Sequence, residues 1–425
     1  MTSAAITHAE DLAAFVDASP SSYHAAAEVA RRLEDAGFTA LHETDAWPQT
    51  PGRYLVVREG AVIAWAVPAG ASPTTPVRIF GAHSDSPGFK LKPQPTTGRL
   101  GWLQAGVEVY GGPLLNSWLD RELRLAGRLV LDDGTVVLAD SGPLLRLPQL
   151  AIHLDRQANE GFALDKQTQT QPVWGVGAAE SADLLAELSA SAGVDASRVR
   201  GFDLVTADSA RGAVFGKDDV FFAAGRLDDL ASVHAGTVAM ARVGDDLAAD
   251  HIPVLAVFDH EEVGSATRSG AGGPFLEEVL ERIGIALGAD RGERLQALGA
   301  SWCVSSDVGH SVHPNYPEKH DPQVRPVLGS GPILKLNANQ RYASDGVGSA
   351  AWRGWCAEAG VTSQDFVSNN TVPCGSTIGP ITATRLGIRT VDVGIPILSM
   401  HSARELAGTS DLLDLARVAQ AYFAG

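Results

Sequence analysis

The sequence predicts an α/β protein in which a mostly parallel sheet is flanked by helices and interrupted by an inserted β-rich domain. From residue 222 onward, short apolar runs alternate with stretches of helical spacing, which is typical of parallel strands covered on both faces. Between residues 94 and 221 the pattern changes to antiparallel hairpins. The chain has 425 residues, too many for one ordinary domain, so an insertion or a second domain is expected.

Caps and breakers define the elements of the first segment, residues 1–93. Residues 8–18 predict a helix, and a second helix would begin at Ser21 or Ser22 and stop at Gly37. Serine caps helix starts and glycine ends helices, which is why these positions are chosen. The strands expected here are a hairpin over 53–67 that turns at Glu59-Gly60 and a buried strand over 77–83.

The middle segment, residues 94–221, would be the inserted domain. Residues 123–140 alternate around Asp133-Gly134, a dipeptide typical of tight hairpin turns. Residues 168–177 resemble a loop, and residues 180–192 have the spacing of a helix.

In the last segment, residues 222–425, strands alternate with helices. Together with residues 1–93 this segment would form the α/β domain. The expected elements are helix 228–243, strand 252–259, helix 273–287, strand 300–307, helix 349–360, strand 388–397 and a last helix from its cap Ser410 to 425.

Composition excludes several classes of protein. The net charge of -17 argues against a nucleic acid or an anionic membrane as partner, because both need a basic surface. The first residues lack the basic and apolar regions of a signal peptide, and no apolar run reaches transmembrane length. Cys303, Cys356 and Cys374 form no CxxC pair, which argues for a reducing compartment. We therefore expect a cytoplasmic protein.

Polar clusters follow four of the predicted strands, and a fifth cluster opens a helix. In an open α/β sheet, ligands bind beyond the carboxyl ends of the strands, so these clusters should converge on one crevice. The clusters contain His83 and Asp85; Asp228 and Asp229 at the helix start; Glu261 and Glu262; Asp307, His310 and His313; and His401.

The joint placement of these residues indicates a metal site. Taken singly, each carboxylate could cap a helix or turn, and each histidine could be an ordinary core or loop residue. Together in one apolar-walled crevice, the acids would repel one another unless cations lay between them. Imidazole and carboxylate bind zinc, and a carboxylate-rich set also admits manganese or cobalt, so we expect two divalent ions.

Several of these stretches, among them SSDVGHSVHPNY from Ser305 and NQRYASD from Asn339, resemble the M18 metallopeptidases, the aspartyl aminopeptidases. The resemblance runs from about residue 80 to 405, nearly the whole chain. The HSD and EEVG motifs occur across the wider clan of co-catalytic zinc peptidases and are less specific. One departure is Asp229, where many relatives have asparagine.

The resemblance implies a dinuclear zinc aminopeptidase that releases N-terminal Asp or Glu from peptides. Glu261 would be the general base, and Asp85 would orient His83 through its other ring nitrogen. The implied ligands are Asp228 as the bridge, His83 and Asp307 for one metal, and Glu262 and His401 for the other.

Substrate contacts are implied at four further residues. An acidic side chain needs a cation, which Lys335 would provide, with Tyr342 as a phenolic donor and Arg341 as the alternative cation. His310 would contact the substrate near the scissile bond. His153, within the insertion, would reach the site of a neighbouring subunit, since members of this family assemble into homo-oligomers, often dodecamers built from dimers.

Three competing hypotheses stay open from the sequence. The first is another co-catalytic peptidase, of the M42 or M20 type, with neutral or C-terminal specificity. The second is a non-catalytic shell or cargo protein that keeps the fold, although every ligand and the base are present here. The third is an amide deacylase that uses the same metals, which only substrate screening separates from a peptidase.

Overall fold

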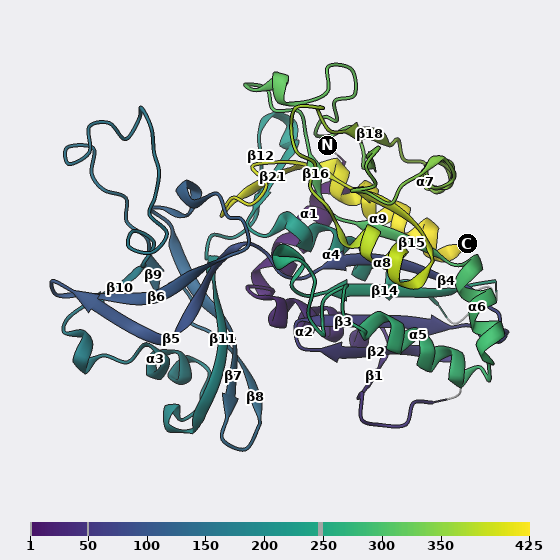
Figure 1. Cartoon of the computed structure of the whole chain (residues 1–425), viewed down its shortest axis with the longest axis horizontal. Helices are drawn as coiled ribbons and strands as arrows, with labels where there is room; N and C mark the ends of the chain where they lie inside the picture. Colours follow the sequence, from purple (N-terminus) through teal and green to yellow (C-terminus); the bar gives the residue numbers. More distant parts are fainter. Residues whose placement is uncertain (1, 49–50, 245–249) are drawn as a thin grey trace.

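The computed structural model describes residues 2–48, 51–244 and 250–425. Figure 1 shows two parts side by side, the inserted sheet domain on the left and the α/β domain with both chain termini on the right. Among the described residues, no helix is both long and apolar enough to cross a membrane.

The α/β domain is built on a nine-stranded sheet in the order β1-β2-β3-β14-β4-β15-β19-β17-β18. Its central neighbours β14, β4, β15 and β19 run parallel, which confirms the predicted mostly parallel core. The bounds are β1 Thr39–Leu41, β2 Gly52–Arg58, β3 Ala61–Val67, β4 Val77–His83, β14 Ile252–Phe258, β15 Trp302–Ser306, β17 Ile333–Leu336, β18 Gln364–Val367 and β19 Arg389–Gly394.

Helices cover both faces of this sheet. One apolar core lies under α1, α2, α4, α7 and α9, and a second lies under α5 and α8 on the other face. The burial of both faces explains why the central strands are apolar throughout. The bounds are α1 Ser3–Ala18, α2 Ser22–Asp35, α4 Leu227–Ala241, α5 Phe275–Ala286, α6 Arg291–Ala300, α7 Gly346–Glu358, α8 Ile378–Leu386 and α9 Thr409–Ala424.

The inserted domain is a seven-stranded sheet in the order β11-β5-β6-β10-β9-β7-β8, and it includes the predicted hairpin β7–β8. Sheet membership alone would start this domain at β5 and end it at β11; the division of the chain into domains stays a prediction. The bounds are β5 Gly88–Arg99, β6 Trp102–Tyr110, β7 Glu122–Leu131, β8 Val136–Asp140, β9 Leu145–Arg146, β10 Val173–Val176, β11 Val199–Asp208 and α3 Leu184–Ser191.

A third, five-stranded sheet brings His310 and His401 to the same side of the α/β domain. Its order is β12-β13-β21-β20-β16, with β16 parallel to β20. His310 ends β16, and the chain reaches His401 three residues after β20. The bounds are β12 Ala213–Phe215, β13 Phe221–Ala224, β16 Gly309–His310, β20 Pro396–Leu398 and β21 Glu405–Gly408.

Two sequence-based expectations were wrong. Ser410 is not the cap of the last helix, because α9 begins at Thr409 after Gly408 and has no side-chain cap. Residues 168–177 are not all loop, because they include strand β10. This strand pairs with β6, and the register of the pairing shifts between Val173 and Gly175. The short 3₁₀ helices are Leu115–Trp118, Ala179–Ser181, Ala196–Arg198, Lys217–Asp219, Glu261–Val263 and Pro317–Lys319.

Candidate metal centre

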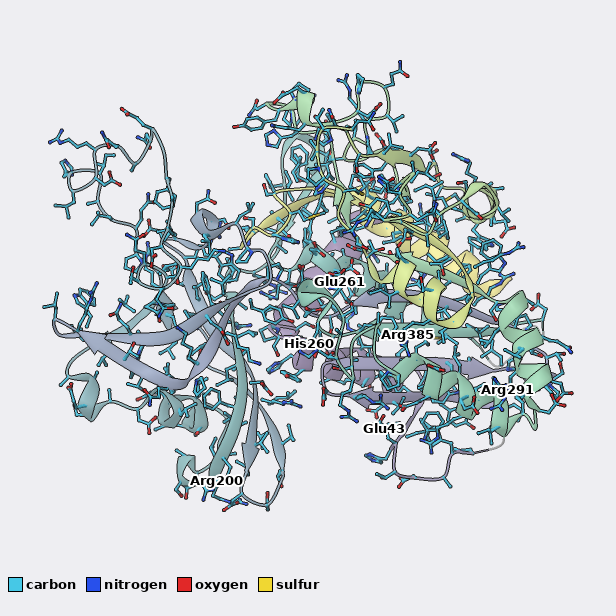
Figure 2. All side chains as sticks on the ribbon, viewed as in Figure 1. Glu43, Arg200, His260, Glu261, Arg291 and Arg385 are labelled. Atoms are coloured by element: carbon cyan, nitrogen blue, oxygen red, sulfur yellow. The ribbon has the colours of Figure 1, made fainter. Side chains whose placement is uncertain are left out.

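The ends of three neighbouring parallel strands bring the acidic clusters together. In the register of β4 with β14, His83 pairs with Phe258, so the loop that carries Glu261 and Glu262 starts level with His83. Asp307 directly follows β15, the other neighbour of β4. Figure 2 shows Glu261 where the α/β domain meets the insertion. The predicted convergence at the carboxyl edge of the sheet is therefore present.

Asp228 lies at the centre of the cluster, with its two carboxylate oxygens facing different histidines. Its Oδ1 is 3.2 Å from Nε2 of His83, and its Oδ2 is 3.4 Å from Nε2 of His401. Nε2 of His401 is also 3.4 Å from Oε2 of Glu262. Asp228 is only 3% exposed, so water cannot solvate the charge of this carboxylate. One carboxylate thus faces both halves of the cluster.

Hydrogen bonds on the far side of each ring determine which nitrogen carries the proton. Nδ1 of His83 is 3.0 Å from the carbonyl oxygen of Asp85, and Nδ1 of His401 is 3.0 Å from the carbonyl oxygen of Gly112. A carbonyl oxygen only accepts, so both Nδ1 atoms donate. In the neutral ring, each Nε2 then directs a lone pair at carboxylate oxygens. Two facing lone pairs require a proton or a metal ion between them.

The charge balance of the cluster favours cations. Among the described residues, Oδ1 of Asp228, Oδ1 of Asp229 and Oε1 of Glu262 are buried without a hydrogen-bond partner. Burial, reinforced by the charge of Asp228, raises the pKa of Glu262 well above its ordinary value. Burial would lower the pKa of His401, but its bond to Asp228 and the charge of Glu262 raise it to about 10. The residues present therefore fit divalent ions, which would satisfy these oxygens without added protons.

Asp307 joins the cluster together with a buried cation. Ligand atoms of Asp228, Asp229 and Asp307 lie within 4.8 Å of one another. Nζ of Lys335 is 3.6 Å from Oδ2 of Asp307, and Lys335 is only 2% exposed. Burial raises the pKa of Asp307, while Lys335 opposes that shift. Asp229 also accepts a hydrogen bond of 3.2 Å from the backbone N–H of His83.

Asp85 forms hydrogen bonds both to His83, at the end of β4, and to the loop that carries Glu261 and Glu262. The contact with Nδ1 of His83 is made at 3.0 Å by its carbonyl oxygen, while its carboxylate is 3.5 Å away. The carboxylate instead accepts from the backbone N–H groups of Glu261 at 2.9 Å and Glu262 at 3.2 Å. Asp85 thus contacts the ring of His83 mainly through its carbonyl oxygen, and its carboxylate binds both N–H groups of the Glu261-Glu262 pair.

Glu405 holds two ligand-bearing segments in the same way, and sequence reasoning did not find it. It is 2% exposed, and its two oxygens accept from the backbone N–H groups of Asp228 at 3.0 Å and His401 at 2.7 Å. Glu405 was visible in the MHSARE stretch, but contacts with backbone groups leave no recognisable sequence pattern. Its role is to fix the backbone on both sides of the cluster.

Among the described residues, none forms a hydrogen bond or ion pair with the carboxylate of Glu261. Burial, reinforced by the charges of Asp307 and Asp228, raises its pKa to about 7, while His83 opposes the shift. A bound divalent cation would lower that value. A carboxylate with a pKa near the working pH has the proton affinity that a general base needs.

A cavity of about 320 Å³ is lined by Met400, the residue before His401, and is large enough for a side chain of a ligand. Its wall includes His310, Tyr342 and Met400, together with Lys319 and His320. Lys335 does not line this cavity; its Nζ lies 5.5 Å from the ring centroid of Tyr342, behind the wall. The expected substrate residues His310 and Tyr342 thus lie together.

His153 lies in a different region, on the long exposed loop between β9 and β10. Figure 1 shows this loop extending away from the α/β domain. His153 is exposed, and so are its neighbours Leu150, Ile152 and Leu154, which are 57%, 47% and 75% exposed. An exposed row of large apolar side chains is typical of a contact surface.

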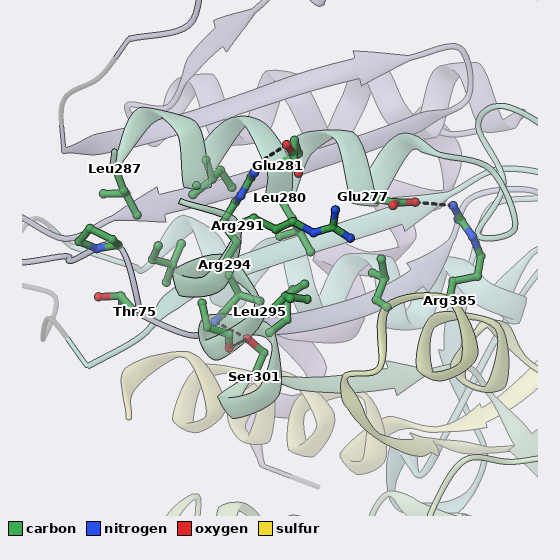
Figure 3. Close-up of a pocket in the computed structure, with 18 residues that line it drawn as sticks. Thr75, Glu277, Leu280, Glu281, Leu287, Arg291, Arg294, Leu295, Ser301 and Arg385 are labelled. Atoms are coloured by element: carbon green, nitrogen blue, oxygen red, sulfur yellow. Dashed lines mark hydrogen bonds and ion pairs between the residues drawn. The ribbon is translucent and has the colours of Figure 1, made fainter. Parts of the chain in front are cut away.

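A larger cavity of about 410 Å³ lies at the opposite edge of the sheet (Figure 3). Val77, Ile252 and Ser301, at or just before the first residues of parallel strands, form part of its wall. Two of its arginines are paired, Arg294 with Glu281 and Arg385 with Glu277. It lies at the amino ends of the strands, whereas ligands of such sheets bind at the carboxyl ends, where the acidic cluster lies.

Comparisons with known proteins place the chain among known relatives. The family model described as aminopeptidase I zinc metalloprotease (M18) matches residues 15–423. A Streptomyces avermitilis protein named probable M18 family aminopeptidase 2 is 54% identical over 422 residues, 98% of each chain.

Two solved structures have the same fold. A chain from a cryo-EM structure of the Ape4 and Nbr1 complex has a TM-score of 0.94 and 35% identity, covering 99% of this chain and 86% of that one. A chain of the S. cerevisiae mApe1 dodecamer has a TM-score of 0.85 and 30% identity, covering 98% and 96%.

Proposed function

The chain belongs to the M18 family of aminopeptidase I zinc metalloproteases, and on this basis we propose a two-metal aminopeptidase that releases N-terminal Asp and Glu from peptides. The family makes it a metallo-aminopeptidase. The observation that supports two ions is the orientation of one buried carboxylate. One oxygen of Asp228 faces His83, and the other faces His401. A carboxylate placed in this way suits a bridge between two metals.

The residues that would hold the ions form two sets that share Asp228. We assign His83 and Asp307 to one set, and Glu262 and His401, whose facing atoms are 3.4 Å apart, to the other. The ligand atoms that lie within 4.8 Å of one another form two groups that also share Asp228, one with His83 and Glu262 and one with Asp229 and Asp307. Nitrogen and oxygen donors suit zinc, with manganese and cobalt as alternatives. When bound, such ions polarise a peptide carbonyl and lower the pKa of a water molecule toward neutrality.

The residues of the chain would carry the proton transfers and the positioning. Glu261, held through its backbone N–H by Asp85, would accept a proton from the attacking water. The same carboxyl would then deliver that proton to the departing amine nitrogen, so one side chain serves as base and then as acid. Two adjacent glutamates are needed because Glu262 faces His401 as a ligand while Glu261 must stay free.

A direct test is to measure metal per chain on purified protein and to assay peptides that begin with Asp, Glu, Leu or Ala. We expect two ions per chain and a clear preference for the acidic peptides. A preference for Leu or Ala would favour an M42-type specificity, and cleavage of acylated amides alone would favour a deacylase. A protein with intact metals and no activity on any of these substrates would be a non-catalytic shell.

Specificity for an acidic side chain needs a cation inside a protein of net charge -17. Lys335 is buried beside Asp307 at the back of the cavity wall formed by Tyr342. We assign the acidic side chain of the substrate to Lys335, with Tyr342 as hydrogen-bond donor. A small movement of Tyr342 would open the path from the cavity to the ammonium group.

Lys335→Met is expected to lower kcat/KM for Asp- and Glu-peptides by about 30-fold or more relative to Leu-peptides, the size of effect typical for a desolvated charge pair. The variant removes the cation and leaves the substrate carboxylate unpaired. The measurement is the ratio of rates on acidic and neutral peptides, since any loss of metal through Asp307 affects both substrates equally. An unchanged ratio would move the role to Arg341.

Activity would also depend on assembly. The related mApe1 structure is a dodecamer, and we propose that this chain forms a homo-oligomer of dimers in which the exposed His153 enters the site of a neighbour. His153 would donate to the developing oxyanion or to the carboxylate of the substrate. The apolar residues beside it would be covered by the partner subunit.

Mixing two inactive variants is expected to restore activity if His153 acts across the interface. His153→Ala and Glu261→Gln are unfolded and refolded together, so that mixed dimers form. A His153→Ala subunit keeps its own Glu261 and receives His153 from its partner, so one site of each mixed dimer is complete. If mixed dimers form and no activity returns, His153 does not act in a neighbouring subunit.

We also propose a cytoplasmic location. The three cysteines are free in the structure, as expected in a reducing compartment, and the strongly acidic composition does not favour binding to an anionic membrane.

A further inference from the structure

A short segment of the insertion crosses to the metal cluster. Residues Tyr110–Leu114, here called the strap, leave the end of β6 and lead into the 3₁₀ helix Leu115–Trp118. The strap contacts three different parts of the site, and each contact involves a different strap residue. The strap residues after Tyr110 lie outside the inserted sheet, because β6 ends at Tyr110.

The first contact is made by the phenol of Tyr110. Its hydroxyl donates to Oδ2 of Asp85 at 2.8 Å. The same carboxylate accepts from the backbone N–H groups of Glu261 and Glu262. Tyr110 therefore restrains the one carboxylate that holds the peptide between the general base and its neighbouring ligand.

The second contact is made by Gly111, which packs directly against Glu262. Its φ is +66°, in the left-handed region, and a Cβ there would lie 3.3 Å from Cβ of Glu262 and 3.4 Å from its carbonyl oxygen. Only glycine adopts this conformation without strain while allowing so close an approach. The backbone of the strap thus forms the surface on which Glu262 rests.

The third contact holds His401 at two points. The carbonyl oxygen of Gly112 accepts from Nδ1 of His401 at 3.0 Å, and the backbone N–H of Leu114 donates to the carbonyl oxygen of His401 at 2.9 Å. The first bond sets the ring orientation and keeps Nε2 free to bind a cation. The second fixes the backbone of the residue itself.

We propose that the strap is a positioning element through which the insertion sets the geometry of the Glu262 and His401 ligands and of the general base. Tyr110 is its positioning side chain; it acts through Asp85 and does not touch the reacting atoms. The proposal rests on the proposed two-metal function and adds a role for the insertion inside its own subunit. It follows that retention of one of the two ions depends on the insertion.

Tyr110→Phe tests this with the loss of one oxygen atom. We expect its affinity for one of the two zinc ions, measured by competition with a chromophoric chelator, to fall about 10- to 100-fold, as is typical when a partner of a metal ligand is lost. kcat for an Asp-peptide should fall by a similar factor at limiting zinc, while KM changes little. The visible absorption of the Co²⁺-loaded variant should shift, since it reports ligand geometry.

Tyr422→Phe is the matched control. The hydroxyl of Tyr422 is also buried and donates to the carbonyl oxygen of Trp302 at 2.9 Å, at the opposite edge of the sheet. This variant also loses one buried phenol hydroxyl, which here donates to neutral backbone carbonyls, and should lose thermal stability. Its zinc affinity and its Co²⁺ spectrum should equal those of the wild type. An equal loss of zinc in both tyrosine variants would indicate general destabilisation and would overturn the proposal.

Gly111→Ala tests the strap by a second route and has its own control in the insertion. Gly101 also has a positive φ, +81°, but no atom lies within 4 Å of its position for Cβ. Gly101→Ala therefore carries similar backbone strain without contact to the site. We expect weaker zinc binding in Gly111→Ala and wild-type binding in Gly101→Ala.

The outcomes separate the strap from the proposed function. A wild type that binds two ions and prefers acidic peptides, with Tyr110→Phe unchanged in zinc affinity, spectrum and kcat, refutes the strap alone. A wild type that binds a single ion refutes the two-metal function, and the strap proposal is overturned with it.

Discussion

Glu261→Gln is expected to keep both metal ions and to lose about 100- to 10,000-fold in kcat, the range typical for loss of a general base. Glutamine has nearly the same shape as glutamate, so the loop after β14 should keep its conformation. The backbone N–H of residue 261 would still donate to Asp85, because that bond does not involve the side chain. Only the ability to accept a proton is lost.

The pH dependence should change with the same substitution. Burial raises the pKa of Glu261 to about 7, and bound cations would lower it from there. A base must be deprotonated to work, so kcat/KM of the wild type should fall as the pH drops below this pKa. The residual activity of Glu261→Gln should lack that acid limb, since the titrating group is gone.

Metal analysis, kinetics and the pH profile together decide this role. Full metal content with wild-type turnover in Glu261→Gln would assign the proton transfer to another residue. A variant that loses both metal and activity would show instead that Glu261 is a ligand, and Glu262 would then be the candidate for the free acid.

The sequence was enough to bring several acidic and histidine residues together, because one topological rule applies to most of them. His83 ends a parallel strand, Glu262 and Asp307 follow two others, and the carboxyl ends of parallel strands meet at one edge. Recognising apolar runs was enough to place these residues without knowing the strand order. Asp228 was found by a different signal, as a carboxylate at the start of a buried helix.

The residues around the ligands could not be predicted in this way. Tyr110 ends a strand of the insertion, and nothing in its neighbourhood indicates that its hydroxyl reaches Asp85, 25 residues earlier in the chain. Glu405 and the carbonyl of Gly112 act on or through backbone groups, which every residue type possesses. Such contacts depend on how two sheets are oriented, and periodicity carries no information about that orientation.

The burial of Lys335 could not be predicted from the sequence either. An isolated lysine in a short strand is usually a solvated charge whose stem covers apolar surface. Here its ammonium group lies beside Asp307 and beneath Tyr342, because β17 runs next to β19 and close to the end of β15. Its ammonium group is 3.6 Å from Asp307, so the proposed specificity residue lies next to a candidate metal ligand.

Asp228→Ala is expected to bind less than one ion per chain, a larger loss than either His83→Ala or His401→Ala, each of which should lose about one ion. The reason is geometric: Oδ1 of Asp228 faces His83 and Oδ2 faces His401, so one substitution removes a ligand from both sets. Without the shared carboxylate, no negative charge between the two cations would offset their mutual repulsion. Activity should fall below detection along with the metal.

The backbone at residue 228 should survive this change, because Glu405 accepts from its N–H group and not from its side chain. Asp411→Ala is a suitable control, since Asp411 is equally buried but accepts from the N–H groups of Gly329 and Gly331, away from the cluster. That variant should lose stability and keep its metal. Metal per chain after dialysis against zinc-free buffer decides the matter: equal losses of one ion in all three ligand variants would mean that Asp228 serves a single site and does not bridge.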